Sequence, residues 1–124
     1  MNALLFIDDE EGIRRSVTRA LKKEHYRLFT AKSGQEGINF VKENINCVET
    51  VVSDYKMPGL DGLKTLSILG GFKPQLTRII LTGYATMEAA IAATNEGIDG
   101  FLTKPFDNLE LRANIHEISL RKHL

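Results

Sequence analysis

Short apolar runs alternate along the chain with segments in which apolar residues recur at helical spacing. The first run, Ala3 to Ile7, is apolar without interruption and stops abruptly at Asp8-Asp9-Glu10. This is typical of a strand that is buried on both faces and ends at solvent. The same pattern predicts further strands over residues 26–30, 48–53, 76–81 and 100–103.

Each predicted strand is followed by a segment with one apolar face. A helix over residues 11–24 is predicted by the stripe of Ile13, Val17, Ala20 and Leu21. Ser33 and Glu36 have the spacing of a capping box, which predicts a second helix start. The remaining helices are predicted from near Asp61 to the pair Gly70-Gly71, from Thr86 to Gly97 with Ile91 among its inward residues, and from Asp107 nearly to residue 124.

Five strands alternating with five helices predict a parallel sheet covered on both faces, because each crossover between parallel strands must be helical and right-handed. The predicted fold class is therefore α/β, doubly wound. No repeat or linker divides the chain, so residues 1–124 are expected to form one domain. Ligands of such sheets bind outside the carboxyl ends of the strands, where five candidate residues fall: Asp8, Asp9, Asp54, Thr82 and Lys104.

The composition narrows the classes of function. A chain of 124 residues that is 43% hydrophobic can build a core without metal or disulfide staples. Sixteen basic residues balance sixteen acidic ones, so no overall charge draws the chain to nucleic acid or anionic lipid. The single cysteine, Cys47, is expected to be a core or half-buried thiol. Without a signal peptide or an apolar run of roughly 20 residues, a cytoplasmic protein is expected.

Three carboxylates gathered at one sheet edge repel one another unless a cation or a proton compensates. Mg²⁺ prefers oxygen ligands and commonly takes one or two carboxylates together with a phosphate. We expect Asp9 and Asp54 to bind it directly and Asp8 through water, with a backbone carbonyl nearby. The Asp54 carboxylate can then act as a nucleophile on phosphorus, with the Lys104 ammonium and the Thr82 hydroxyl facing the phosphoryl oxygens.

Four short motifs, each at a predicted strand end, carry a family resemblance. They are Asp8-Asp9-Glu10, the run from Ser53 to Gly62, Leu81-Thr82-Gly83 and Thr103-Lys104-Pro105-Phe106. Any one of them is common by chance, but together and in this order they are not. Across essentially all of its residues the chain resembles the receiver domain of two-component response regulators.

The resemblance implies a role for each candidate residue. Asp54 would be the phosphoacceptor, and Thr82 and Lys104 would contact the phosphoryl group. Mg²⁺ would be held by Asp8, Asp9, Asp54 and the backbone carbonyl of Lys56. The domain would catalyse its own phosphorylation and hydrolysis without being a classical enzyme.

The resemblance also implies a flavodoxin-like strand order, 2-1-3-4-5, and a cis peptide bond between Lys104 and Pro105. A switch through Thr82 and Phe101 would connect the site to an output face made by residues 86–97, 100–103 and the last helix. The implied partners are a histidine kinase or a histidine phosphotransfer protein. A homodimer through the output face and a linked effector domain outside this chain are further expectations.

Two residues flank the expected phosphoryl position. Lys56 lies two residues after Asp54, and Tyr84 lies two residues after Thr82. Because a bulky ring at position 84 would obstruct an attacking water, we predict slow self-dephosphorylation.

Three rival interpretations are weaker. A haloacid-dehalogenase-like phosphatase would require Asp-x-Asp after the first strand, where this chain has Asp8-Asp9. A flavin-binding domain of the same topology would require a phosphate-binding loop rich in Ser, Thr and Gly at that place. A degenerate receiver acting only as a scaffold is disfavoured because every site position is filled.

Overall fold

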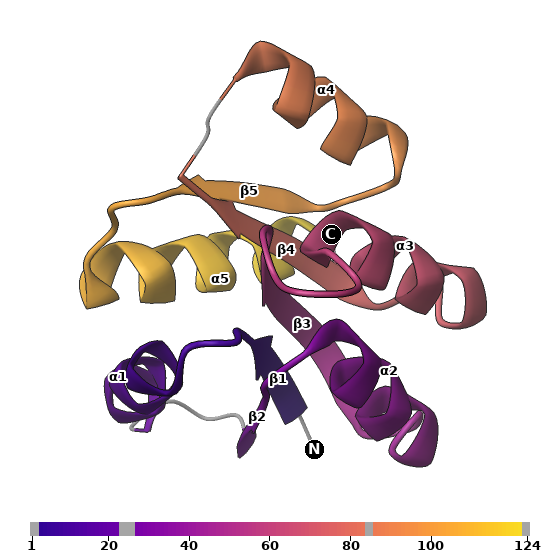
Figure 1. Cartoon of the computed structure of the whole chain (residues 1–124), viewed down its shortest axis with the longest axis horizontal. Coiled ribbons are helices and arrows are strands. Elements are labelled where there is room, and N and C mark those ends of the chain that lie inside the picture. Colours follow the sequence, from indigo (N-terminus) through magenta and orange to yellow (C-terminus); the bar gives the residue numbers. More distant parts are fainter. Residues whose placement is uncertain (1–2, 23–26, 84–85, 123–124) are drawn as a thin grey trace.

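The computed structural model describes residues 3–22, 27–83 and 86–122 (Figure 1). Strands and helices alternate along the chain in the order β1 (Ala3–Ile7), α1 (Glu11–Leu21), β2 (Arg27–Ala31), α2 (Gly34–Glu43), β3 (Val48–Asp54), α3 (Gly62–Phe72), β4 (Thr77–Thr82), α4 (Met87–Asn95), β5 (Gly100–Thr103) and α5 (Asn108–Lys122). The strands form one parallel sheet in the order β2-β1-β3-β4-β5. This confirms the predicted doubly wound, flavodoxin-like α/β fold.

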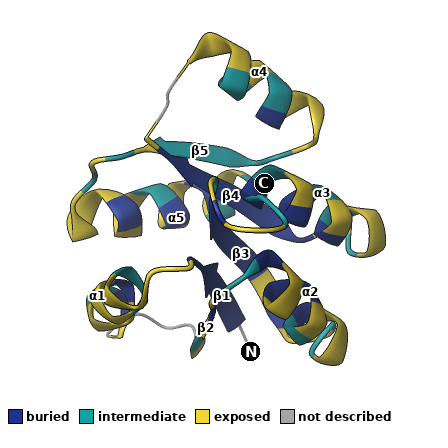
Figure 2. Cartoon of the chain, in the orientation of Figure 1, coloured by how far each residue is buried: buried dark blue, intermediate teal, exposed yellow. Residues whose placement is uncertain are grey.

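Helices cover both faces of the sheet, with α1 and α5 on one face and α2 and α3 on the other (Figure 1). The two faces arise from the alternation of side chains along each strand. In β1, Leu4 and Phe6 pack toward α1 and α5, whereas Leu5 and Ile7 pack toward α2 and α3. Figure 2 shows the result, with buried strands at the centre and helices that are buried on one side only.

Several helices begin with a side-chain cap at the residue where the sequence predicts the helix start. The Ser33 hydroxyl accepts a hydrogen bond from the Glu36 backbone N–H at 3.1 Å. The Glu36 carboxylate accepts from Lys32 N–H rather than from Ser33 N–H. Thr86 caps α4 in the same way as Ser33 caps α2. Because these contacts satisfy N–H groups that have no partner within the helix, they fix where each helix begins.

Some predicted boundaries differ from the structure. Helix α1 ends at Leu21, and the predicted end at Glu24 and strand start at Tyr26 lie outside the described residues. The prediction that Gly70-Gly71 stops a helix is wrong, because α3 continues through both to Phe72. A Cβ at Gly70 would lie 2.1 Å from Nη1 of Arg78 on β4. Gly70 is therefore suited to close packing inside a helix rather than to its end.

Two predictions of burial are also wrong. Cys47 is exposed, because it lies in the turn between α2 and β3, where its N–H donates to the Asn44 carbonyl. Ile91 is 53% exposed, although it was expected to face inward from α4. Among the described residues of α4 only Ala93 is buried. This helix therefore contributes the small side chain of Ala93 to the core and leaves its largest side chains in solvent.

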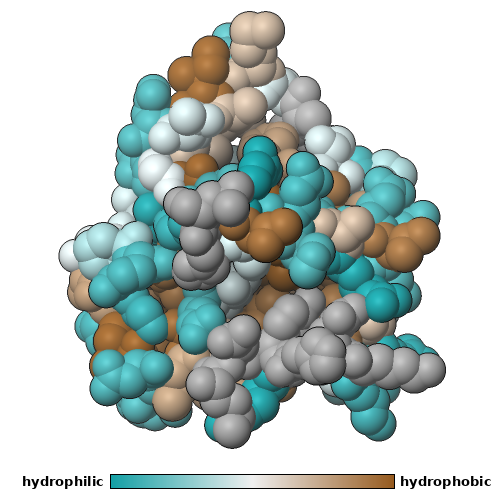
Figure 3. Space-filling view, turned by 180° about the vertical axis from the view of Figure 1, so that it is seen from behind, coloured by the Kyte–Doolittle hydropathy of each residue, from teal (hydrophilic) through white to brown (hydrophobic). Residues whose placement is uncertain are grey.

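Hydrophobic side chains gather at the top of the molecule, where α4 protrudes (Figure 3). Met87 and Ile91, one turn apart on α4, are among the most exposed large apolar residues of the described chain.

Within the described residues, no helix has the length and apolar character needed to cross a bilayer.

Candidate functional site

The strand register brings the predicted site residues to one edge of the sheet. Ile7 of β1 lies opposite Ser53 of β3, so the next residues, Asp8 and Asp54, are neighbours. Asp54 in turn lies opposite Leu81 of β4. Thr82 follows Leu81 and pairs with Thr103, the residue before Lys104. Parallel pairing alone therefore places these side chains at the carboxyl end of adjacent strands, as predicted.

Asp8 is held by the turn that joins β1 to α1. The Glu10 backbone N–H donates to Asp8 Oδ1 at 2.9 Å. Arg14, in the first turns of α1, donates from Nη1 to the Asp8 carbonyl at 2.8 Å. Asp8 is only 1% exposed, and its second carboxylate oxygen, Oδ2, is buried without a hydrogen-bond partner among the described residues. A buried carboxylate oxygen without a donor is costly, which makes it a natural position for a cation.

Asp8, Asp9 and Asp54 form an acidic cluster in which one carboxylate oxygen from each lies within 4.8 Å of the others. Burial raises the pKa of Asp8 to about 6, opposed by the hydrogen bond from Glu10 N–H and reinforced by the charges of Asp54 and Asp9. Asp8 and Asp54 are buried, whereas Asp9 is exposed. The cluster thus combines two buried carboxylates with one carboxylate that faces solvent.

Lys104 neutralises part of this negative charge. Its Nζ lies 2.7 Å from Asp54 Oδ1, and the two side chains are 33% and 11% exposed. Burial lowers the pKa of Lys104, but the hydrogen bond and the charge of Asp54 outweigh it, so the pKa is raised overall. Lys104 N–H donates to the Thr82 carbonyl at 2.7 Å, and the bond between Lys104 and Pro105 is cis as expected.

The other predicted residues occupy three different settings. Thr82 is 3% exposed at the end of β4. Lys56 is exposed in the loop after β3, two residues beyond Asp54. Phe101 is half-buried on β5, at the side of the sheet that carries Ile80. Tyr84 lies outside the described residues.

Two further residues support the site, and sequence reasoning assigned neither of them a role. Gly62 opens α3, and a Cβ there would lie 2.0 Å from the carbonyl oxygen of Asp54. Its N–H donates to the Tyr55 carbonyl at 2.7 Å, so α3 begins directly against the end of β3. Arg14 fixes the turn after Asp8. Gly62 ends the motif that runs from Ser53, but only the close approach of α3 to β3 explains why this position is a glycine.

A doubly wound sheet with an acidic cluster and a paired lysine at its carboxyl edge defines a class of signalling domain. Residues 4–116 match the response regulator receiver domain family, and the chain belongs to this family. Receiver domains are signalling modules of two-component systems rather than enzymes in the usual sense.

Known proteins agree with this assignment. The chain is 36% identical over 104 residues to the transcriptional regulatory protein GlrR of Escherichia coli K12, an alignment that covers 84% of this chain and 23% of that protein. It is 32% identical over 118 residues to the cell cycle response regulator CtrA of Brucella ovis, covering 95% and 50%. The crystal structure of a response regulator receiver domain protein from Clostridium thermocellum superimposes with a TM-score of 0.90 at 33% identity, covering 99% and 98% of the two chains.

The two curated relatives are longer than the match. The chain spans about a quarter of one and half of the other. What these complete proteins do is therefore not transferred to this chain by the similarity.

Proposed function

We propose that this domain accepts a phosphoryl group on Asp54 from a phosphohistidine of a sensor kinase or a phosphotransfer protein. The observation that carries the proposal is the 2.7 Å contact between Lys104 Nζ and Asp54 Oδ1 beside two further carboxylates. The contact with Lys104 holds the Asp54 carboxylate in one orientation, as a nucleophile requires. We further infer that residues 1–124 form a single receiver domain.

The chemistry requires one substitution at phosphorus. A carboxylate oxygen of Asp54 forms the new P–O bond while the P–N bond to the donor imidazole breaks, and the imidazole leaves as a neutral group after protonation. Lys104, already at the Asp54 carboxylate, balances the charge that builds up on the phosphoryl oxygens. Thr82 would supply a hydroxyl donor to the same oxygens. Hydrolysis later breaks the same P–O bond and restores the carboxylate.

The acidic cluster fits a magnesium ion. Asp8, Asp9, Asp54 and the Lys56 carbonyl would hold it, and the orphaned Asp8 Oδ2 is the clearest sign of a missing positive neighbour. The donors are all oxygen atoms, which is the chemistry that Mg²⁺ prefers. When bound, Mg²⁺ would screen the repulsion between the carboxylates and the incoming phosphate. Burial and the charge of Asp54 raise the pKa of Asp8, and a bound cation would offset both effects.

The output of the domain would be the face made by α4, β5 and α5. Phe101 lies on this face and lines a cavity of about 220 Å³ together with Ala90 and Ala93 of α4. We propose that Thr82 and Phe101 change position together when Asp54 is phosphorylated, and that Phe101 then uses this space. A second copy of the chain or a covalently linked effector would bind the altered face.

The test is incubation with acetyl phosphate and Mg²⁺, followed by intact mass measurement. The wild-type chain is expected to gain one phosphoryl group, and Asp54→Asn is expected to gain none. Asp61→Asn is the matched control, because Asp61 caps α3 through Oδ1, an acceptor that asparagine keeps. This variant should be labelled like the wild type.

The metal requirement is read in the same assay. Chelation of Mg²⁺ with EDTA should abolish the mass gain, and Mg²⁺ in excess of the chelator should restore it. Labelling of Asp54→Asn at the wild-type rate would refute the assignment of the phosphoacceptor. A wild-type chain that stays unlabelled with every phosphodonor would favour the scaffold interpretation instead.

A further inference from the structure

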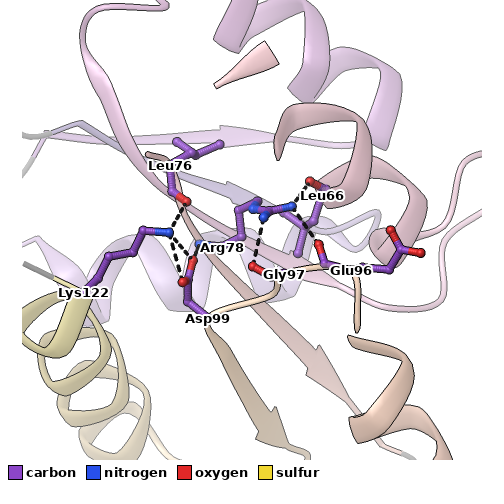
Figure 4. Close-up of polar contacts among 7 residues, drawn as sticks. All are labelled: Leu66, Leu76, Arg78, Glu96, Gly97, Asp99 and Lys122. Atoms are coloured by element: carbon purple, nitrogen blue, oxygen red, sulfur yellow. Dashed lines mark hydrogen bonds and ion pairs between the residues drawn. The ribbon is translucent and has the colours of Figure 1, made fainter. Parts of the chain in front are cut away.

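The end of β4 farthest from the acidic cluster carries a buried cation that the proposed chemistry does not use. Arg78, near the start of β4, is only 8% exposed. Its guanidinium donates from Nη1 to the Leu66 carbonyl of α3 at 2.8 Å and from Nη2 to the Gly97 carbonyl at 2.9 Å. A longer contact of 3.3 Å joins Nη1 to the Glu96 carbonyl. Figure 4 shows the guanidinium between these three carbonyls.

Two glycines leave room for the Arg78 guanidinium. A Cβ at Gly70 would lie 2.1 Å from Arg78 Nη1, and a Cβ at Gly97 would lie 2.8 Å from Nη2. Gly97 also has a φ of +77°, a conformation that other residues rarely adopt. The pair of glycines therefore allows α3 and the C-terminal end of α4 to approach the guanidinium closely.

The surroundings of Arg78 secure the same region. The Arg78 N–H donates to Asp99 Oδ2 at 2.8 Å, and the Asp99 N–H donates back to the Arg78 carbonyl. Lys122 of α5 lies 3.0 Å from the Asp99 carboxylate and also donates to the Leu76 carbonyl (Figure 4). On the surface, the Ser67 hydroxyl of α3 donates to the Glu96 carboxylate at 2.7 Å.

The N-terminal half of α4 has no comparable anchor among the described residues. Met87 is 80% exposed, and the first buried residue of the helix is Ala93. The cavity of about 220 Å³ lies between α4, β5 and α5, and Asn114 on its wall has a buried side-chain oxygen without a partner in the described chain. The helix is thus fixed at one end and loosely packed along the rest.

Moving the fixed end would be costly. A buried guanidinium stays ionised, so losing the carbonyls of Glu96 and Gly97 would leave an unsatisfied charge in the protein interior. These carbonyls also stand at the negative end of the helix dipole, which favours a cation there. Helix α4 can shift at its N-terminal turn without breaking any of these contacts.

We propose that Arg78 is a positioning residue that fixes the C-terminal end of α4, so that α4 moves by rotation about residues 96–97. The N-terminal turn of the helix follows the carboxyl end of β4, where Thr82 lies, and it is the part that moves. Arg78 precedes Thr82 by four strand residues, about 13 Å, so the fixed end lies far from the acidic cluster. That this rotation follows phosphorylation rests on the proposed function, whereas the fixed end is a property of the resting domain.

Hydrogen exchange of single backbone amides, followed by NMR, tests the resting domain. The amides of residues 96–98 are expected to exchange at least tenfold more slowly than those of residues 89–91, the reverse of ordinary fraying at a helix end. In Arg78→Met the amides of residues 96–98 should exchange at least tenfold faster than in the wild type. The amides of Leu5 and Val51 in the central strands report global unfolding and should change much less.

Two further variants sharpen this test. Arg78→Lys keeps the charge and part of the hydrogen bonding, so it should restore part of the protection. Arg15→Met removes an exposed arginine of α1 and should leave α4 unchanged. Protection at residues 96–98 within twofold of the wild type in Arg78→Met would overturn the proposal, and so would a loss shared equally by Leu5 and Val51.

Beryllofluoride with Mg²⁺, a mimic of the phosphoryl group, tests the movement. Exchange at residues 87–90 should change at least threefold, while residues 96–98 should change by less than twofold. The opposite pattern would overturn the rotation. No response anywhere, with the resting difference between the two ends of α4 intact, would count against the phosphoacceptor function and leave the fixed end supported.

Discussion

Asp8 stabilises the site geometry but destabilises the fold. Its carboxylate accepts from Glu10 N–H, yet burial and the neighbouring Asp54 raise its pKa to about 6 from an ordinary value of 3.8. A raised carboxyl pKa means that the folded state binds more protons than the unfolded state between these two values. The free energy of unfolding therefore falls as the pH rises through this window, and the penalty is complete above about pH 6.

Asp8→Asn is expected to stabilise the metal-free domain at neutral pH. Asparagine keeps the acceptor for Glu10 N–H and removes the buried charge, so the free energy of unfolding should rise by roughly 2–3 kcal/mol at about pH 7.5. The gain should shrink steadily as the pH is lowered toward about 4. Urea unfolding in EDTA over this pH range measures it. A gain that does not depend on pH would show that the charge of Asp8 is not its cause.

The positions of the candidate site residues were predictable because each stands at the end of a predicted strand. Asp54 is the last residue of β3, and Asp8 and Lys104 directly follow β1 and β5. Parallel pairing brings such ends together whatever the details of packing. The role of Gly62 was not predictable in this way, because it depends on how closely α3 approaches the carbonyl of Asp54. The exposure of Cys47 likewise depends on a turn that the apolar pattern does not reveal.

In helix α3 the start could be predicted from the sequence, but the end could not. The sequence predicts its start near Asp61, and in the structure the Asp61 carboxylate caps the helix by accepting a hydrogen bond from Lys64 N–H. Its end was predicted too early, because two adjacent glycines usually weaken a helix. The reason for Gly70 lies on β4, in the guanidinium of Arg78, and a contact between a helix and the next strand leaves no periodic pattern in the sequence.

Gly70 and Gly71 should respond in opposite ways to alanine. In Gly70→Ala the new Cβ would collide with the guanidinium of Arg78. Three carbonyls hold this guanidinium, so it cannot move without breaking hydrogen bonds. The free energy of unfolding should therefore fall by about 1–3 kcal/mol. Gly71 has open space around it. In Gly71→Ala the free energy of unfolding should rise by about 0.5–1 kcal/mol, because alanine lowers the conformational entropy of the unfolded chain. Chemical unfolding of both variants at one pH measures the difference. Equal effects would contradict the packing argument.

For the whole molecule, the two ends of the sheet differ in character. At the carboxyl end, like charges are gathered around an unsatisfied oxygen, and at the other end Arg78 and Lys122 are held by carbonyls and by Asp99. The alternating strands and helices that connect these ends followed from the apolar pattern, whereas the strand order was implied by the family resemblance. The contacts that hold Arg78 did not follow from either, because they join side chains and carbonyls across α3, β4 and the end of α4.

Magnesium should therefore stabilise the entire domain through its carboxyl end. A ligand that binds only the folded state raises the free energy of unfolding by about 2.7 kcal/mol at a free concentration of about 100 times Kd. Thermal unfolding of the wild type should move to higher temperature with increasing Mg²⁺. Asp8→Asn, although more stable without metal, should move much less, because it has lost a charged oxygen ligand.

Asp107→Asn provides the matched control for this experiment, because Asp107 caps α5 through Oδ1 and lies outside the acidic cluster. Its response to Mg²⁺ should equal that of the wild type. The wild type and Asp8→Asn should therefore exchange their order of stability, or at least approach each other, as Mg²⁺ is added. Parallel shifts of all three proteins would mean that the ion binds elsewhere, and the acidic cluster would then lose its assignment as the metal site.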